Sequence, residues 1–210
     1  MRRFLPALFA AVLIALVGMP AFAADTYQEG KHYEVISPPV PTASTDKIEV
    51  VELFWYGCGH CFSFEPLVHD WLKTKPADVE FRQIPAVFAP NWVPHARAFY
   101  AAAALGVSDK LHRPLFDAIH VDERKLFTEE SLVKFADEVG IPKAEFADAY
   151  ASFAIDGKIK QAMLATRDYG INGVPSVIVN GKYRVTATLA GGQKDMLKVV
   201  NFLVDKERAR

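Results

Sequence analysis

The chain has 210 residues, a length that suits one domain or one domain with a sizeable insertion. Hydrophobic residues make up 51% of the sequence and charged residues 23%, which is enough apolar material for a packed core and excludes a disordered chain. The formal net charge is -1, with 24 basic and 25 acidic side chains, so nothing in the composition indicates nucleic-acid binding, which requires a basic face.

Residues 1–23 have the pattern of a cleaved signal peptide. Two arginines precede an apolar run, and Ala21 and Ala23 fit the small-x-small rule for cleavage. A retained membrane anchor is the alternative, but the run is shorter than the roughly 20 residues that a span requires, and Pro6 interrupts it. We therefore expect a mature chain that begins at Ala24 and works in an oxidising compartment.

The first half of the mature chain predicts a strand–helix–strand unit. Residues 48–55 are β-rich and almost continuously apolar, as in a central strand covered on both faces, and a short edge strand is expected within 32–36. A helix follows, and residues 79–84 predict a second strand, so the two strands should pair in parallel with a right-handed crossover. The apolar stripe of the helix comprises Cys61, Phe64, Val68 and Leu72.

The second half predicts a block of helices and then a return to the sheet. The pattern is helical throughout residues 94–169. One of its apolar stripes comprises Phe146, Tyr150 and Phe153, and a longer helix that ends at Gly170 follows, with the stripe Ile155, Ile159, Met163 and Thr166. Two strands, 176–179 and 183–186, flank Asn180-Gly181, a strong hairpin signal, and a last helix ends the chain. The predicted order is therefore β-α-β, a helical block, and β-β-α.

The chain contains two cysteines, Cys58 and Cys61. Cysteines that staple an exported protein usually lie far apart, because a longer closed loop constrains the unfolded chain more. A bridge across two intervening residues adds little stability, so this pair indicates redox chemistry. A structural zinc site is the alternative, but it needs two further ligands, and the chain has no other cysteine and no close pair of histidines outside the motif.

The motif Cys58-Gly59-His60-Cys61 falls at a predicted strand-to-helix junction. The first turn of a helix has unpaired N–H groups and a partial positive charge, so we expect the pKa of Cys58 to lie below the free value of about 8.5. His60 adds a donor and, when protonated, a positive charge. Cys61 shares the apolar stripe and should be buried. We therefore predict that Cys58 attacks or releases the substrate and that Cys61 resolves the mixed disulfide.

Two further positions near the motif are open to more than one interpretation. Glu52 lies in the predicted central strand, where burial would raise its pKa and suit a proton acceptor for the Cys61 thiol. A carboxylate at a strand end that reaches solvent is the alternative, and the residues alone do not decide between the two. Val174-Pro175 precedes a strand, and an ordinary trans bond is the default, because only about 5–6% of such bonds are cis.

Over nearly the whole mature chain the sequence resembles the DsbA family of periplasmic thiol–disulfide oxidases, within the thioredoxin superfamily. The segments that carry the resemblance are residues 27–33, 52–61, 104–110, 114–116, 173–175 and 179–183. The family's α/β fold, a thioredoxin domain with an all-helical insertion, agrees with the predicted order of elements. On this resemblance residues 24–93 form the first part of the thioredoxin domain, 94–169 the insertion, and 170–210 the second part.

The resemblance implies a role for each residue around the motif. Cys58 matches the exposed nucleophile, Cys61 its buried partner, and His60 the residue that makes the disulfide oxidising. Glu52 matches a buried acid beneath the motif. No cofactor and no metal is implied, and the family passes its electrons to a membrane quinone reductase, DsbB.

The resemblance also implies an edge that binds the substrate peptide. Pro175 matches a cis-proline loop beside the first cysteine, and Val174 would offer backbone groups to an extended peptide. Gly59, which we also assign to substrate binding, stands where the best-known members have proline. A second departure is Gln83, at a strand position where we expect a basic partner for the buried acid.

We therefore predict a monomeric periplasmic oxidase that donates its Cys58–Cys61 disulfide to newly exported, cysteine-containing proteins. An enzyme with many unfolded clients needs non-specific contacts, so we expect an uncharged surface around His60 and Val174. The alternatives are a disulfide isomerase or reductase on the same scaffold and a non-enzymatic peptide-binding module. Isomerases of this compartment usually carry a separate dimerisation domain, for which no residues remain here.

Overall fold

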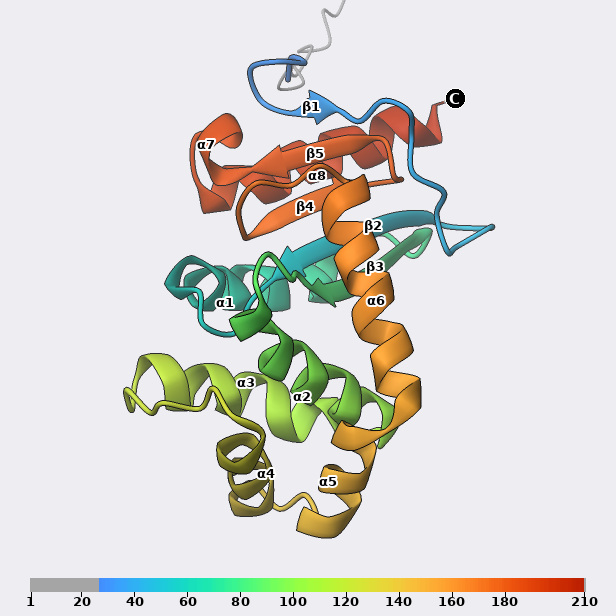
Figure 1. The fold of residues 1–210 in the computed structure, drawn as a ribbon. Helices are drawn as coiled ribbons and strands as arrows, with labels where there is room; N and C mark the ends of the chain where they lie inside the picture. The colour runs from blue at the N-terminus through green and yellow to red at the C-terminus, as the bar shows by residue number, and fades with distance from the viewer. Residues whose placement is uncertain (1–26, 210) are drawn as a thin grey trace, which may run out of the picture.

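The computed structural model describes residues 27–209, and its centre is a five-stranded sheet in the order β1-β5-β4-β2-β3 (Figure 1). β2 pairs in parallel with β3 and antiparallel with β4, which confirms the predicted crossover unit and the returning hairpin. The strands are β1 (Glu34–Val35), β2 (Ile48–Phe54), β3 (Val79–Pro85), β4 (Ser176–Val179) and β5 (Tyr183–Thr186).

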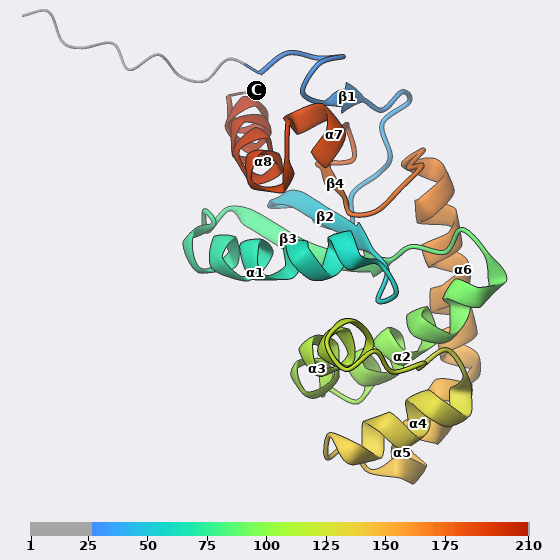
Figure 2. The same ribbon diagram turned by 90° about the vertical axis from the view of Figure 1, so that its left-hand side faces the viewer.

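Helices cover both faces of the sheet, which explains why β2 is almost continuously apolar. On one face lie α1 (Gly59–Thr74), which joins β2 to β3, and α8 (Gln193–Arg208) (Figure 2). The indole N–H of Trp71 on α1 donates to Asn201 Oδ1 on α8 at 2.8 Å, which ties these two helices together. The short helix α7 (Ala187–Ala190), which the sequence pattern did not predict, connects β5 to α8.

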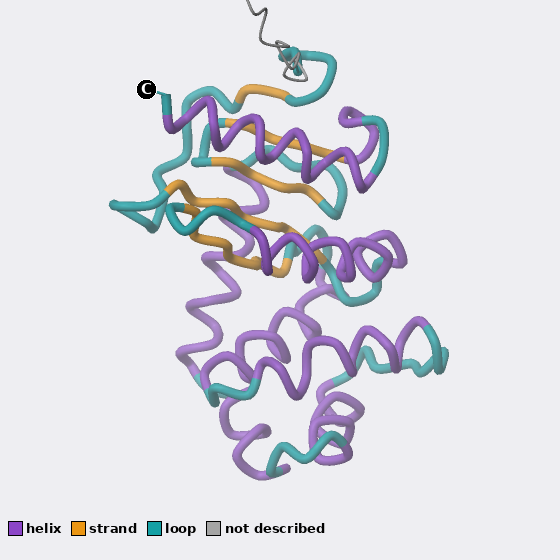
Figure 3. The backbone as a smooth tube through the Cα atoms, turned by 180° about the vertical axis from the view of Figure 1, so that it is seen from behind, coloured by secondary structure: helices purple, strands orange, loops and turns teal. Residues whose placement is uncertain are grey.

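In the sequence, the helical block lies between β3 and β4. In space, it forms a second lobe beside the sheet (Figures 1 and 3). Its elements are η1 (Pro90–Trp92), α2 (Val93–Ala104), α3 (Ser108–His120), α4 (Glu129–Glu138), α5 (Lys143–Ala151) and α6 (Phe153–Asp168). The long helix α6 returns the chain to the sheet and covers the face opposite α1. The core of the block is continuous with Phe54, Tyr56 and Cys61, so the cysteine motif lies where the two lobes meet.

Three residues assigned to apolar stripes are in fact exposed, among them Met163 on α6. Phe153 is 84% exposed, because α5 ends at Ala151 and the extended residue Ser152 starts a new helix in another direction. Leu72 is 37% exposed, and its neighbour Trp71 takes the buried place on α1. The expected signal peptide lies outside the described residues. Within residues 27–209, none of the helices combines the length and the apolar character that crossing a membrane requires.

Candidate active site

The two cysteines occupy unequal positions at the end of β2. Cys58 is the N-cap of α1, and its sulfur accepts the backbone N–H of Cys61 at 3.3 Å. Cys58 is partly exposed, whereas Cys61 lies on the buried face of the helix and is 0% exposed. Both cysteines are free thiols in this structure. The predicted burial of Cys61 is therefore confirmed, and only Cys58 is open to attack from solvent.

The electrostatic surroundings separate the two thiols further. The pKa of Cys58 is lowered to about 6, chiefly because the Cys61 thiol donates to its sulfur. The backbone N–H groups of Cys61 and His60 lower it further, against the opposing effect of partial burial, and the charge of His60 contributes least. Burial, followed by interaction with Cys58, raises the pKa of Cys61 far above the usual range of a thiol. A reduced pair is therefore one thiolate and one thiol at neutral pH.

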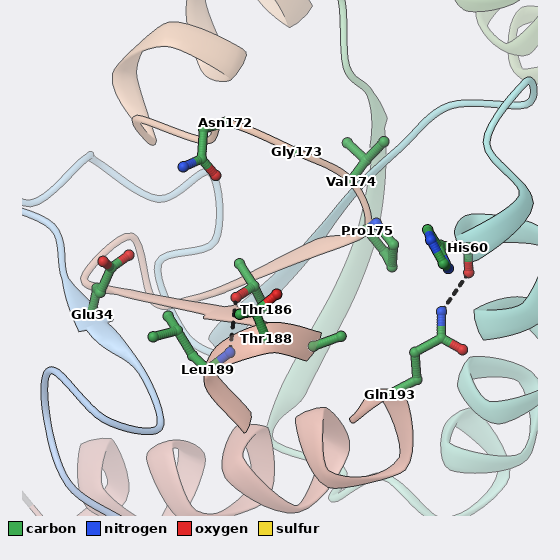
Figure 4. A pocket seen from close by; sticks show the side chains of 11 residues that line it. Glu34, His60, Asn172, Gly173, Val174, Pro175, Thr186, Thr188, Leu189 and Gln193 are labelled. Atoms are coloured by element: carbon green, nitrogen blue, oxygen red, sulfur yellow. Dashed lines mark hydrogen bonds between the residues drawn. The ribbon is translucent and has the colours of Figure 1, made fainter. Parts of the chain in front are cut away.

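An open cavity of about 480 Å³ lies beside the motif (Figure 4). His60 reaches its rim, and the backbone oxygen of His60 accepts a hydrogen bond from Gln193 Nε2 at 2.6 Å. The cavity is lined by Glu34, His60, Asn172, Gly173, Val174, Pro175, Thr186, Ala187, Thr188, Leu189 and Gln193. Glu34, the acidic residue of this lining, is paired with Arg184 at 2.5 Å. The surface around His60 and Val174 is thus largely uncharged, as predicted.

The loop before β4 brings Val174 to the motif from a distant part of the chain. The Val174–Pro175 bond is cis, and the Cys58 thiol donates to the Val174 carbonyl oxygen at 3.4 Å. The placement that the resemblance implied for this loop is therefore confirmed. A second cis bond, Ser37–Pro38, was not predicted.

Glu52 is a buried acid and not a strand-end carboxylate in solvent. It is 0% exposed, and its Oε2 accepts a hydrogen bond from Gln83 Nε2 at 2.9 Å. Its Oε1 is buried and has no hydrogen-bond partner among the described residues. Burial, followed by the charge of Glu65, raises the pKa of Glu52 to about 8. Glu52 therefore carries a proton at neutral pH in the reduced protein.

Sequence reasoning missed two residues that contact this acid's partner. Gln83 Nε2 also donates to Glu65 Oε1 at 3.0 Å, and the same oxygen lies 3.1 Å from His112 Nε2. Glu65 lies one turn after Cys61 on α1, a spacing that could have indicated a position near the buried thiol. His112 comes from α3, and no local pattern points to it. The acid beneath the cysteines therefore belongs to a larger polar cluster.

The CxxC motif lies at a strand-to-helix junction that stabilises the thiolate of its first cysteine, and the sheet carries a helical insertion. This combination defines a thiol–disulfide oxidoreductase with the thioredoxin fold. Residues 49–203 match the family described as "DSBA-like thioredoxin domain". The chain therefore belongs to the DsbA-like family of this fold.

Curated relatives and solved structures agree with this assignment. The chain is 43% identical over 197 residues to the thiol:disulfide interchange protein DsbA of Pseudomonas aeruginosa, covering 94% of this chain and 93% of that protein. It is 42% identical to the DsbA of Pseudomonas syringae pv. tomato, with 95% and 94% of the two chains covered. A crystal structure of Pseudomonas aeruginosa DsbA superposes with a TM-score of 0.85, at 44% identity, covering 89% of this chain and 97% of that one.

Proposed function

We propose that the protein oxidises pairs of thiols in newly exported proteins by transferring its Cys58–Cys61 disulfide to them. The observation that carries this proposal is the place of Cys58 at the N-cap of α1, where its sulfur accepts the backbone N–H of Cys61 at 3.3 Å and its pKa is lowered to about 6. A stabilised thiolate favours the reduced form of the enzyme, while the disulfide carries no charge and gains nothing from the same surroundings. The enzyme's disulfide is therefore a better oxidant than one in an unfolded chain.

The reaction proceeds through a mixed disulfide. A substrate thiolate attacks Cys58 Sγ, the bond between the two enzyme sulfurs breaks, and the electron pair leaves on Cys61 Sγ. Cys61 then takes up a proton, since its thiolate is strongly disfavoured by burial. Glu52, protonated and with its Oε1 unpartnered among the described residues, is the proposed donor. A second substrate thiolate attacks the substrate sulfur of the mixed disulfide, which releases the oxidised substrate and the Cys58 thiolate.

The proposed substrate contact is the edge formed by Val174, Pro175 and Gly59. The Val174 carbonyl oxygen lies 3.4 Å from Cys58 Sγ, and Gly59, the residue that follows Cys58, is exposed. An extended peptide that pairs with backbone groups here is bound with little regard to its side chains. The largely uncharged cavity beside His60 would accommodate those side chains.

We further propose that residues 1–23 are removed on export and that the mature enzyme works in the periplasm. The apolar leader supports export, and an oxidising compartment is where a disulfide donor can act. Each turnover leaves a Cys58 thiolate and a Cys61 thiol, so an oxidant must accept two electrons and the Cys61 proton must leave. We assign this role to a membrane quinone reductase of the DsbB type, as the resemblance implies.

The test is the direction of exchange with a reduced peptide that carries two cysteines. Oxidised enzyme, in equal amount, should convert most of the peptide to its disulfide at pH 7, as measured by mass spectrometry after acid quenching. A Cys58→Ala variant should convert none. If the equilibrium instead favours the reduced peptide, the protein is a reductase and the proposal is wrong. Faster repair of a scrambled, already oxidised protein than oxidation of the peptide would favour an isomerase.

A further inference from the structure

Five side chains from four parts of the fold form a polar cluster beneath the cysteines, which we call the acid cluster. Glu52 comes from β2, Glu65 from α1, Gln83 from β3 and His112 from α3, while Tyr56 follows β2. Hydrogen bonds run from Glu52 through Gln83 and Glu65 to His112 and Tyr56. The side chains of Glu65 and His112 retain 12% and 17% of their exposure, so this end of the cluster reaches solvent.

The hydrogen atoms of the cluster can be assigned by counting donors. The amide of Gln83 has two hydrogens, which go to Glu52 Oε2 and Glu65 Oε1, so its 3.4 Å approach to the imidazole is not a third hydrogen bond. A carboxylate only accepts, so His112 Nε2 carries a hydrogen and donates it to Glu65. Nδ1 lies 2.8 Å from Tyr56 Oη and can either accept from it or donate to it. Both the neutral and the protonated imidazole therefore fit.

The ionisable groups that contact the imidazole of His112 are acidic. Among the described residues its ionisable contacts are Glu65 from α1 and Tyr56, and Glu52 lies beyond the neutral Gln83 of β3. The other rings around it are apolar and come from Phe54, Phe99 and Phe116. On α3 the next residue is Arg113, which is paired with an aspartate of the same helix at 2.8 Å. Within the acid cluster, His112 is thus the one side chain that can carry a positive charge.

The charge of Glu65 influences the ionisation of Cys58 through Glu52. Glu65 raises the pKa of Glu52, and Glu52 and the Cys58 thiolate disfavour each other's charge. A positive charge 3.1 Å from Glu65 offsets the negative charge that the reduced pair would otherwise face. The disulfide carries no charge, so a positive charge beside Glu65 stabilises only the reduced state of the cysteine pair.

We propose that His112 is a positioning residue which, in its protonated form, neutralises Glu65 and thereby favours the reduced, thiolate-bearing state of the Cys58–Cys61 pair. This inference rests on the proposed function, since it concerns how strongly the same pair oxidises its substrates. It makes the oxidising strength depend on pH through a residue remote from the motif in sequence. Histidine is suited to this because its charge changes near neutral pH.

The first test compares His112→Gln with the wild type in glutathione buffers from pH 5.5 to 8. The variant keeps a polar side chain but cannot become charged, so its equilibrium constant for reduction should fall about two- to threefold between pH 6 and 7, where the Cys58 thiol, with its pKa of about 6, is ionised and a histidine can still carry a charge. The two curves should converge toward pH 8, because histidine side chains lose their charge near neutral pH, and also toward pH 5.5, where Cys58 takes up its proton. His69→Gln is the matched control, because His69 is exposed on α1, and its curve should follow the wild type. A constant offset at every pH, or no offset, overturns the proposal.

The second test needs no variant and decides the matter if His112→Gln does not fold. Coupling between two sites is reciprocal, so reduction of the cysteines must make His112 hold its proton to higher pH. The imidazole C–H signals of oxidised and reduced wild type, followed by NMR over the same pH range, should show this displacement. Identical titration curves in both redox states overturn the proposal. Failure of the wild type to oxidise the reduced peptide would instead refute the proposed function, and the NMR comparison would still test the coupling.

Discussion

Raising the pH should stabilise the reduced protein relative to the oxidised protein. The pKa of Cys58 is about 6 in the fold against a reference value of 9.0. Because the folded pKa is the lower one, this stabilisation is fully present above pH 9 and is lost as the pH falls through about 6. The disulfide form has no thiol to ionise. Closing the short loop also changes the stability of the oxidised form, but that effect does not vary with pH.

The size of the effect follows from the two pKa values. Between pH 5 and pH 8, ionisation of Cys58 should add about 2.6 kcal/mol to the free energy of unfolding of the reduced protein. We halve this value to about 1.3 kcal/mol because Cys58 is partly exposed and its charge is screened by solvent. In a chain of this size that corresponds to a change of roughly 3–5 °C in the difference between the two melting temperatures. Glu52, whose pKa is raised, destabilises both forms as the pH rises through 8, so most of its contribution cancels in the difference.

Circular-dichroism melts of both redox forms at pH 5, 6, 7 and 8 would measure this difference. A phosphine reductant keeps the cysteines reduced across the range. The control is a variant in which both Cys58 and Cys61 are replaced by serine, whose melting temperature should not respond to the reductant at any pH. If the difference stays constant or shrinks as the pH rises, the Cys58 thiolate is not stabilised by the fold, and the argument for an oxidase loses its basis.

Three further outcomes are expected. Cys61→Ala, mixed with a client peptide dimer joined by one disulfide, should accumulate mixed disulfides on non-reducing gels, because Cys58 attacks the peptide disulfide, one peptide leaves as a thiolate, and no Cys61 thiol is present to resolve the product; rapid release of the bound peptide would contradict this. Gly57→Ala should lower the free energy of unfolding in urea by about 1–3 kcal/mol, since a Cβ there would lie 2.4 Å from Cζ2 of Trp55, and no loss would mean that the indole can move. Glu52→Gln should gain stability over the wild type by about 2 kcal/mol between pH 5 and pH 7, because the buried carboxyl resists ionisation; parallel stability curves would show that it ionises freely.

The elements predicted best are those with local signals. The strands 176–179 and 183–186 match β4 and β5 to the residue, because an Asn-Gly turn fixes both ends of a hairpin. The boundary between α5 and α6 was expected after Phe153 and lies instead at Ser152, because Phe153 continues the helical spacing of the preceding stripe. No glycine or proline marks the break at Ser152, whose extended backbone is set by tertiary packing of the two helices.

The same distinction separates the site residues found from those missed. The CxxC motif and the Val174-Pro175 loop have short signatures, so a sequence pattern can identify them. Glu65 and His112 belong to the site because they contact each other and because Glu65 contacts Gln83. Along the chain, Glu65 lies 47 residues from His112 and 18 residues from Gln83. A polar cluster assembled from four elements has no periodicity in the sequence, and only the packing of α3, α1, β2 and β3 brings its side chains together.

The neutral side chain at position 83 explains why a buried acid suits this site. A lysine there would have stabilised both carboxylates and lowered the pKa of Glu52. The amide of Gln83 instead bridges Glu52 and Glu65 by hydrogen bonds without adding charge, so Glu52 stays protonated at neutral pH. Oxidation of a client expels Cys61 as a thiolate in a place where burial strongly disfavours it. We therefore infer that the neutral amide at position 83 separates two needs of the reaction: the N-terminus of α1 favours a thiolate at Cys58, while the buried acid behind it holds a proton ready for Cys61.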